Sequence, residues 1–399
     1  MKFKKHYFRG HVPDGFSSLY TAKTINFAAS GLLGIFLPIF LYNLFEGDFA
    51  LTMMWYLIGS LLYMIVVAYG AQFLDKVGFR RSLQISAVLG ALFYLTFYFM
   101  DTGGSIRYLV PLSIIALTAW RMTYWLPYHI KFTQLTDKRN RGKQVSVMLA
   151  TASLLGIFAP IIAGTLITKL GFDILFIIAI VLFLASGIPY ITIPRTHEKY
   201  SWSYKETWRQ LFLKKNRTIV VPMMADGAEN VIGVVVWPIF IFNILDGNYF
   251  EVGAVSTLII GFTIIVQLLT GSYIDGKGKR KLLRLGSVLY SLGWIFKIFV
   301  ATTFHIFVAG IYHSVMKVFT RTPFDTLVYE IAADQGHYID EFSTLREMAI
   351  SMGKALMLIV TIVISLYTSV VWTFVFAAAA SLLFNILYVK QIHLIGETK

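Results

Sequence analysis

The chain contains no cysteine among its 399 residues, and charged residues make up only 14% of it. Without cysteine it can form neither disulfides nor thiolate metal sites, so its sequence carries no sign of the redox state of its compartment. With so little charge and 57% hydrophobic residues, it lacks the polar surface that covers a soluble domain. The composition therefore predicts an integral membrane protein.

Motifs of common enzyme chemistry are also missing from the sequence. The eight histidines form no His-x-x-x-His or Glu-x-x-His metal pattern, and no Gly-x-Ser-x-Gly nucleophile elbow occurs. The run from Gly276 to Lys279 is not a phosphate-binding Walker loop. The sequence therefore predicts no enzyme, no cofactor, no metal and no transport driven by ATP.

Apolar runs long enough to cross a bilayer, which takes roughly 20 residues, recur along nearly the whole chain. The first run follows a basic segment but is about twice as long as a signal-peptide core, which predicts a retained helix. We expect an all-α integral membrane protein with twelve transmembrane helices, at residues 17–44, 50–72, 82–101, 107–130, 144–169, 172–193, 217–245, 250–273, 282–303, 304–331, 343–367 and 369–390.

The net charge of +14 follows this predicted topology. Basic residues gather in every second connection, which by the positive-inside rule places both termini in the cytoplasm of a multi-pass protein of the cell membrane. The lipid bilayer then accounts for the positive charge, and no nucleic-acid partner is expected. The basic clusters lie at residues 2–9, 76–81, 138–143, 214–217 and 277–284.

The sequence repeats itself at an offset of 200 residues. The segment from Pro38 to Gly47 returns as Pro238 to Gly247 with half of its ten positions identical. A fixed period over unconnected segments indicates one unit used twice. The predicted halves are residues 1–194 and 217–399, joined by a cytoplasmic linker at 195–216 whose aromatic and charged pattern predicts an amphipathic helix at the membrane surface.

A short polar loop also occurs twice and carries a family resemblance. Its matching positions are Asp75, Gly78, Arg80 and Arg81 in the first copy and Asp275, Gly278 and Arg280 in the second. The pattern resembles the signature Gly-x-x-x-Asp-x-x-Gly-Arg/Lys-Arg/Lys of the major facilitator superfamily. The first copy departs from that signature at Ala71 and Phe79.

This resemblance implies a fold of two pseudo-symmetric six-helix halves around a central cavity. Helices 1, 4, 7 and 10 would line the cavity, helices 2, 5, 8 and 11 would support it, and helices 3, 6, 9 and 12 would face lipid. The resemblance also implies that the two loops act as gates. In that role Asp75 and Asp275 would hold the cytoplasmic ends together while the cavity faces outward.

Two acids, Asp226 and Glu229, lie near the middle of the seventh predicted span. Because they are three residues apart, they share one face of the helix. An ionised and unpaired carboxylate is costly at that depth, so the pair could carry a proton as its access to water alternates. The alternative is static pairing with the cavity arginines or Lys317. Asn26 occupies the position equivalent to Asp226, so an acidic function belongs to the second half alone.

Other polar and aromatic residues also fall on the expected lining helices. On the tenth span, polar residues recur every four positions and form one stripe. The expected cavity set is Asn26, Trp120, Arg121, Trp125, Trp237, His313, Lys317, Arg321 and Asp325. Three charged residues lie outside the lining helices, namely Lys297 on the ninth span and the pair Glu347 and Lys354 on the eleventh. We expect the long side chain of Lys297 to reach water near the outer end of its helix.

The predicted function is secondary active transport of a small organic solute by alternating access, with H⁺ as the coupling ion. A partial antiporter motif from Gly156 to Gly164 favours export by exchange. Arg121 and Arg321 leave open an organic-anion carrier, because planar guanidinium groups suit carboxylates and phosphates. A lipid translocator without tight ion coupling is a further alternative. We expect the protein to act as a monomer.

Overall fold

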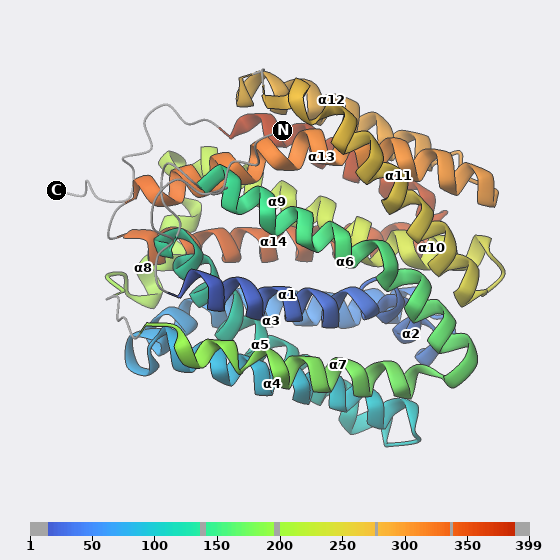
Figure 1. The fold of residues 1–399 in the computed structure, drawn as a ribbon, viewed down its shortest axis with the longest axis horizontal. Helices are drawn as coiled ribbons and strands as arrows, with labels where there is room; N and C mark the ends of the chain where they lie inside the picture. Colours follow the sequence, from blue (N-terminus) through green and yellow to red (C-terminus); the bar gives the residue numbers. More distant parts are fainter. Residues whose placement is uncertain (1–14, 136–140, 195–199, 276–277, 336–337, 388–399) are drawn as a thin grey trace, which may run out of the picture.

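The computed structural model describes residues 15–135, 141–194, 200–275, 278–335 and 338–387. Within these ranges, the side chains of residues 267–275 and of several residues between 141 and 149 lie outside the description. The described part of the chain is almost entirely helical and contains no strand (Figure 1). The all-α class predicted from the apolar runs is confirmed.

The N-terminal half is built from seven α-helices and one short 3₁₀ helix in the described ranges. They are α1 (Phe16–Leu33), α2 (Phe36–Leu44), α3 (Phe49–Val77), α4 (Phe79–Asp101), α5 (Ile106–Leu135), α6 (Arg141–Leu170), α7 (Phe172–Ser186) and η1 (Pro189–Thr192).

The linker and the C-terminal half follow the same plan. The linker holds α8 (Tyr204–Phe212) and η2 (Lys214–Asn216). The second half holds α9 (Arg217–Val231), the π-helical turn η3 (Ile232–Val236), α10 (Trp237–Ile244), α11 (Tyr249–Asp275), α12 (Lys279–Lys297), α13 (Thr303–Asp334), α14 (Ile339–Tyr367), η5 (Val370–Trp372), α15 (Thr373–Leu382) and η6 (Leu383–Ile386).

Eight helical segments of the described chain are long and apolar enough to cross a membrane, and α1 with α2, bent by 44°, could form a ninth. The three other expected spans fall on α12, α13 and α15. The first two carry several charges and the last is short, so their crossing of the bilayer stays a prediction. Large apolar side chains are exposed along α3, α4, α11 and α14. Exposure of this extent suits contact with lipid.

The repeat predicted from sequence extends to the backbone. The turns after α2 and α10 both place a non-glycine residue and then a glycine at positive φ. The φ angles are 55° and 80° at Glu46 and Gly47, and 48° and 78° at Asp246 and Gly247. The break between α1 and α2 and the π-helical turn η3 also occupy equivalent places. The two halves therefore share local geometry as well as sequence.

The two halves meet mainly along two helix pairs, α3 with α14 and α6 with α11. In Figure 1 the N-terminal half forms most of the lower part of the bundle, and α8 lies across its left end. We call that end the α8 end. At Gly253 of α11 the contact is so close that a Cβ atom would lie 2.4 Å from the carbonyl oxygen of Pro160. Glycine is needed there because the two backbones touch.

Candidate functional site

A cavity of about 750 Å³ lies between the halves, near the middle of the long helices. Seven predicted cavity or coupling residues line it, namely Trp120, Arg121, Trp125, Asp226, Lys317, Arg321 and Asp325. Helices expected only to support the cavity also line it, through Tyr63 of α3, Ser153 of α6 and several residues of α14. The assignment of helices 2, 5 and 11 to support alone is therefore corrected.

The two acids of α9 share one arginine. Arg321 forms an ion pair with Asp226, and its second terminal nitrogen donates to Glu229 Oε2 over 3.0 Å. The Tyr290 hydroxyl donates to the other oxygen of Glu229 over 2.5 Å. The Glu229 side chain is fully buried. In this structure both acids are paired, which is the arrangement that the static alternative described.

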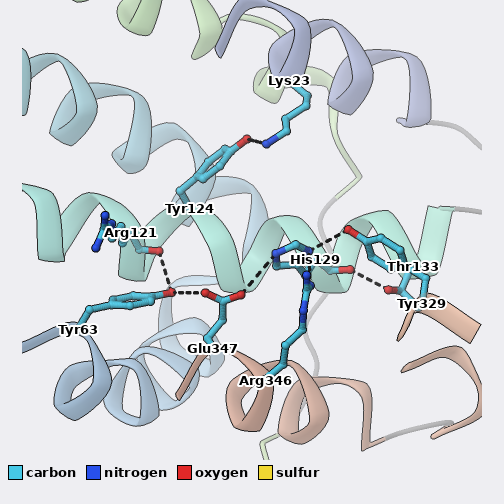
Figure 2. Close-up of polar contacts among 9 residues, drawn as sticks. All are labelled: Lys23, Tyr63, Arg121, Tyr124, His129, Thr133, Tyr329, Arg346 and Glu347. Carbon is cyan, nitrogen blue, oxygen red and sulfur yellow. Dashed lines mark hydrogen bonds and ion pairs between the residues drawn. The ribbon is translucent and has the colours of Figure 1, made fainter. Parts of the chain in front are cut away.

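A second polar cluster joins the two halves beside the cavity (Figure 2). Glu347 of α14 accepts a hydrogen bond from the Tyr63 hydroxyl over 3.2 Å and lies 3.5 Å from His129 Nε2. His129 Nδ1 lies 3.1 Å from a terminal nitrogen of Arg346 and 3.1 Å from the Tyr329 hydroxyl. Sequence analysis missed this cluster as a site. The signal was present, because Arg346 and Glu347 are adjacent charges in an otherwise apolar run.

The geometry fixes the hydrogen-bonding roles of His129. A guanidinium group can only donate, so Nδ1 accepts from Arg346. The proton of the neutral ring then lies on Nε2, which faces Glu347 Oε1 over 3.5 Å. Glu347 thus accepts a hydrogen bond from Tyr63 and lies next to His129, both in the N-terminal half, while His129 accepts from Arg346 of the C-terminal half. The cluster ties α3 and α5 to α14.

Three cations face the cavity without forming an ion pair to any described residue. Within the described residues, the side chains of Arg121, Lys317 and Lys354 make no hydrogen bond or ion pair, although each lines the cavity. Five basic and three acidic side chains line the cavity in all. Asp226 and Glu229 pair with Arg321, and Arg346 contacts His129, so the basic lining residues whose side chains form no ion pair or hydrogen bond among the described residues are Arg121, Lys317 and Lys354.

Three predicted cavity residues lie behind the cavity wall. Asn26 donates to the Tyr190 hydroxyl over 3.2 Å, deep in the N-terminal half. Trp237 and His313 are packed inside the C-terminal half, where the Lys297 ammonium lies 4.1 Å from the centre of the Trp237 ring. The expectation that Lys297 reaches water is wrong, because its side chain points into this core and only 2% of the residue is exposed.

The first signature loop contacts the linker at the α8 end. The two oxygens of Asp75 lie 3.1 and 3.2 Å from the backbone nitrogen of Tyr200, and Glu341 of α14 accepts from the next amide, that of Ser201, over 2.7 Å. Burial raises the pKa of the Tyr200 phenol above its usual range. Two consecutive amides of the linker are therefore held by acids from opposite halves.

The remaining loop residues play local parts. Gly78 has a φ of 78° and ends α3, a conformation that L side chains rarely adopt. Gly278 precedes α12 with a φ of −57°, so the two copies differ in backbone. Arg81 and Arg280 are exposed, and Arg80 is half-buried. The Asp275 side chain lies outside the described residues.

Removal of the Asp75 carboxylate should open the α8 end. We expect Asp75→Ala to raise the labelling rate of a cysteine placed at Ser153 by about tenfold or more, because bonds to a charged acceptor contribute about 1.5–3 kcal/mol. The reagent is a membrane-impermeant maleimide added on the α8 side. The chain has no cysteine of its own, so the introduced thiol reports alone.

A matched control for this experiment is Lys76→Ala, one residue further along the same loop and exposed. It should leave the labelling rate of Ser153→Cys unchanged. Equal labelling rates in the Asp75 variant and the unmodified background would show that the contact with the linker does not hold this end closed.

A helical membrane protein with a central charged cavity between two related halves has the architecture of a solute transporter. The model of the Major Facilitator Superfamily matches residues 19–225, which is just over half of the chain. The chain belongs to this superfamily, whose members are transporters. Among curated proteins, none matches the chain significantly.

Proposed function

We propose that the protein is a proton-coupled secondary active transporter of a small organic anion. The observation that carries this proposal is the presence of three cavity cations, Arg121, Lys317 and Lys354, that form no ion pair with any residue that the structure describes. A charged group at such depth is costly unless it is paired. A carboxylate or phosphate of the solute supplies the missing partner, and Trp120 and Trp125 supply apolar contact for the rest of it.

Proton coupling follows from competition for Arg321. This residue lines the cavity and is bound to Asp226 and Glu229. An anionic solute that approaches Arg321 weakens its bond to Asp226, which then lacks a cation and takes up a proton. Binding of anion and proton is therefore mutually favourable, and linkage requires the effect to be reciprocal. This mechanism moves both species in the same direction.

A cationic solute would have the opposite effect. It would compete with the proton for Asp226, so that solute and H⁺ move in opposite directions. That is the exchange mode that the pattern from Gly156 to Gly164 favours. The direction of proton movement on addition of a solute thus separates an anion symporter from a cation antiporter, whichever compound in a panel proves to be the solute.

We expect solute-driven proton movement in wild-type proteoliposomes and its loss in the double variant Asp226→Asn with Glu229→Gln. Both replacements keep side-chain shape but cannot release a proton. The measurement is the fluorescence of an enclosed pH dye while a panel of aromatic carboxylates, organic phosphates and quaternary ammonium compounds is added. Acidification of the interior on addition of external anions is the result expected.

The matched control is Glu251→Gln, an exposed acid at the start of α11 and far from the cavity. It should retain wild-type proton movement. Alkalinisation by the ammonium compounds would instead identify a cation antiporter. Solute transport that persists in the double variant without proton flux would contradict proton coupling by the acid pair, and would favour a uniporter or a lipid translocator.

We also propose that the α8 end faces the cytoplasm of a cell-membrane protein. The basic residues of the linker and of the α12 start gather at this end, as in Lys214, Lys215, Lys279 and Arg284. Positive charge is enriched on the cytoplasmic side of membrane proteins. The solute cavity then opens alternately past the linker contacts and past the opposite end.

A further inference from the structure

A buried polar chain runs inside the C-terminal half, away from the cavity. It begins at Glu229, which accepts from the Tyr290 hydroxyl. The Tyr290 ring lies 4.6 Å from the His313 ring, measured between centres, and His313 lies 4.4 Å from the Trp294 ring. The Lys297 ammonium then lies 4.1 Å from the centre of the Trp294 ring. None of these five residues is more than 5% exposed.

Several groups of this chain are left without a polar partner. In the described residues, His313 Nδ1 and Trp294 Nε1 have no hydrogen-bond partner. The Lys297 ammonium meets the faces of Trp237 and Trp294, and no described carboxylate lies within 4 Å of it. A buried charge without a carboxylate partner lowers stability. This buried polar chain therefore lowers the stability of the folded protein, which indicates that it has a role other than stabilising the fold.

The N-terminal half shows that the fold does not need these charges. At the equivalent positions, 200 residues earlier, it carries Ala29, Gly90, Tyr94, Phe97 and Ser113. Phe97 takes the place of Lys297 and packs its ring 5.8 Å from that of Phe40. Ser113 takes the place of His313 and accepts a hydrogen bond from Trp55 Nε1 over 3.0 Å. The same architecture is thus built in one half with an aromatic core and in the other with a polar chain.

We propose that this chain carries the coupling proton inside the C-terminal half, between Glu229 and the end of the bundle opposite α8. The inference rests on the proposed proton-coupled function and adds a proton route that is separate from the solute cavity. Lys297 is the last residue of α12, so it marks the end of the route that lies nearest to the opposite surface. Glu229 marks the other end, where it holds Arg321.

Each group on the route that gives up a proton receives another proton from the next group. The Tyr290 hydroxyl gives its proton to Glu229 Oε1 and takes one from His313, directly or over a bridging water. As His313 gives up the proton of one ring nitrogen, its other ring nitrogen takes a proton from the Lys297 ammonium over a bridging water, and the resulting amine takes the incoming proton from a hydronium ion, which becomes water. Protonation of Glu229 then removes one of the two negative charges on Arg321. Charged and titratable groups around His313 are Tyr290 and Lys297 on α12 and Lys317 on its own helix.

The test separates solute exchange from proton coupling. We expect Lys297→Phe, which copies the residue of the other half, and His313→Gln to lower transport driven by a pH gradient by more than about tenfold. Exchange of labelled for unlabelled solute at equal pH on both sides, which needs no net proton transfer, should stay within about twofold of wild type. The readouts are uptake of labelled solute and the fluorescence of an enclosed pH dye.

A stability measurement excludes a merely structural role. Replacement of an unpaired buried ammonium by an apolar ring should raise the melting temperature of Lys297→Phe by about 2 °C. A lower melting temperature together with loss of exchange would overturn the proposal, because it would make Lys297 a structural residue. The cavity variant Lys354→Met serves as a control, with weaker solute binding but an unchanged ratio of protons to solute, because Lys354 lies on α14 and lines the cavity.

Failure of the route and failure of the function give different results. Wild-type coupling in both Lys297→Phe and His313→Gln would overturn the route and leave proton-coupled transport in place. If the wild-type protein exchanges solute and moves no protons, the proposed coupling fails, and the route fails with it.

Discussion

Arg321→Gln is expected to cost about 3–5 kcal/mol of folding free energy, the range found when one partner of a buried ion pair is removed. Arg321 is the shared partner of Asp226 and of the fully buried Glu229. Its loss leaves two carboxylates close together in the bundle without a cation. Thermal unfolding of the purified protein in detergent measures the change, and transport of any solute should be abolished.

The repeat offers a matched control for this prediction. Arg121 is the equivalent residue of the N-terminal half, but its guanidinium has no acidic partner within the described chain. Arg121→Gln should therefore leave the melting temperature almost unchanged. Addition of Asp226→Asn and Glu229→Gln to Arg321→Gln should restore stability without restoring transport. A single Arg321→Gln variant as stable as wild type would contradict the role of this arginine as a counter-ion.

The second large effect concerns the three cavity cations. Arg121→Gln, Lys317→Met and Lys354→Met should each weaken binding of the anionic solute by about 10- to 100-fold, because a hydrogen bond to a charged group contributes about 1.5–3 kcal/mol. None of the three should destabilise the protein, since none leaves a bonded partner behind. Isothermal titration with the anion identified in the proteoliposome panel measures the affinities.

Arg107→Gln is the control for these variants, because Arg107 is an exposed cation near the start of α5 and outside the cavity. Its affinity for the solute should equal that of wild type. If all three cavity variants bind the anion as tightly as wild type, the cations do not form the binding site. Tighter binding of an ammonium compound by Lys354→Met would point to a cationic solute instead.

The internal repeat was the most informative feature of the sequence. The offset of 200 residues predicted two related halves, and the backbone repeats the same turn at Glu46 and Asp246. The repeat also identified residues that differ between the two halves, such as Asp226, whose equivalent in the N-terminal half is Asn26. The repeat did not predict the polar chain that ends at Lys297. Phe97 is the equivalent residue of the N-terminal half, and its replacement by lysine suggests a role only because the structure shows that the Lys297 side chain is buried.

The candidate site was predicted in part. Seven predicted cavity or coupling residues line the cavity, because a charge within an apolar span is expensive and so marks the interior. The same rule applied to Arg346, Glu347 and Lys354, yet the implied role of the eleventh helix as a support led away from them. Pairing of both acids with Arg321 was one of several alternatives, since any of the cavity cations could have served.

By itself, the sequence determined the membrane class, the superfamily, the all-helical architecture and the repeat, because these depend on composition, on the length of apolar runs and on local motifs. Only the tertiary structure decided which partners Glu229, Glu347 and Lys297 meet. The physical reason is that lipid is as apolar as the interior of the protein. In a soluble protein, polar residues mark the face of a helix that is exposed to solvent. Most faces of a membrane helix are apolar, so its rotation about its own axis is set by packing against neighbouring helices.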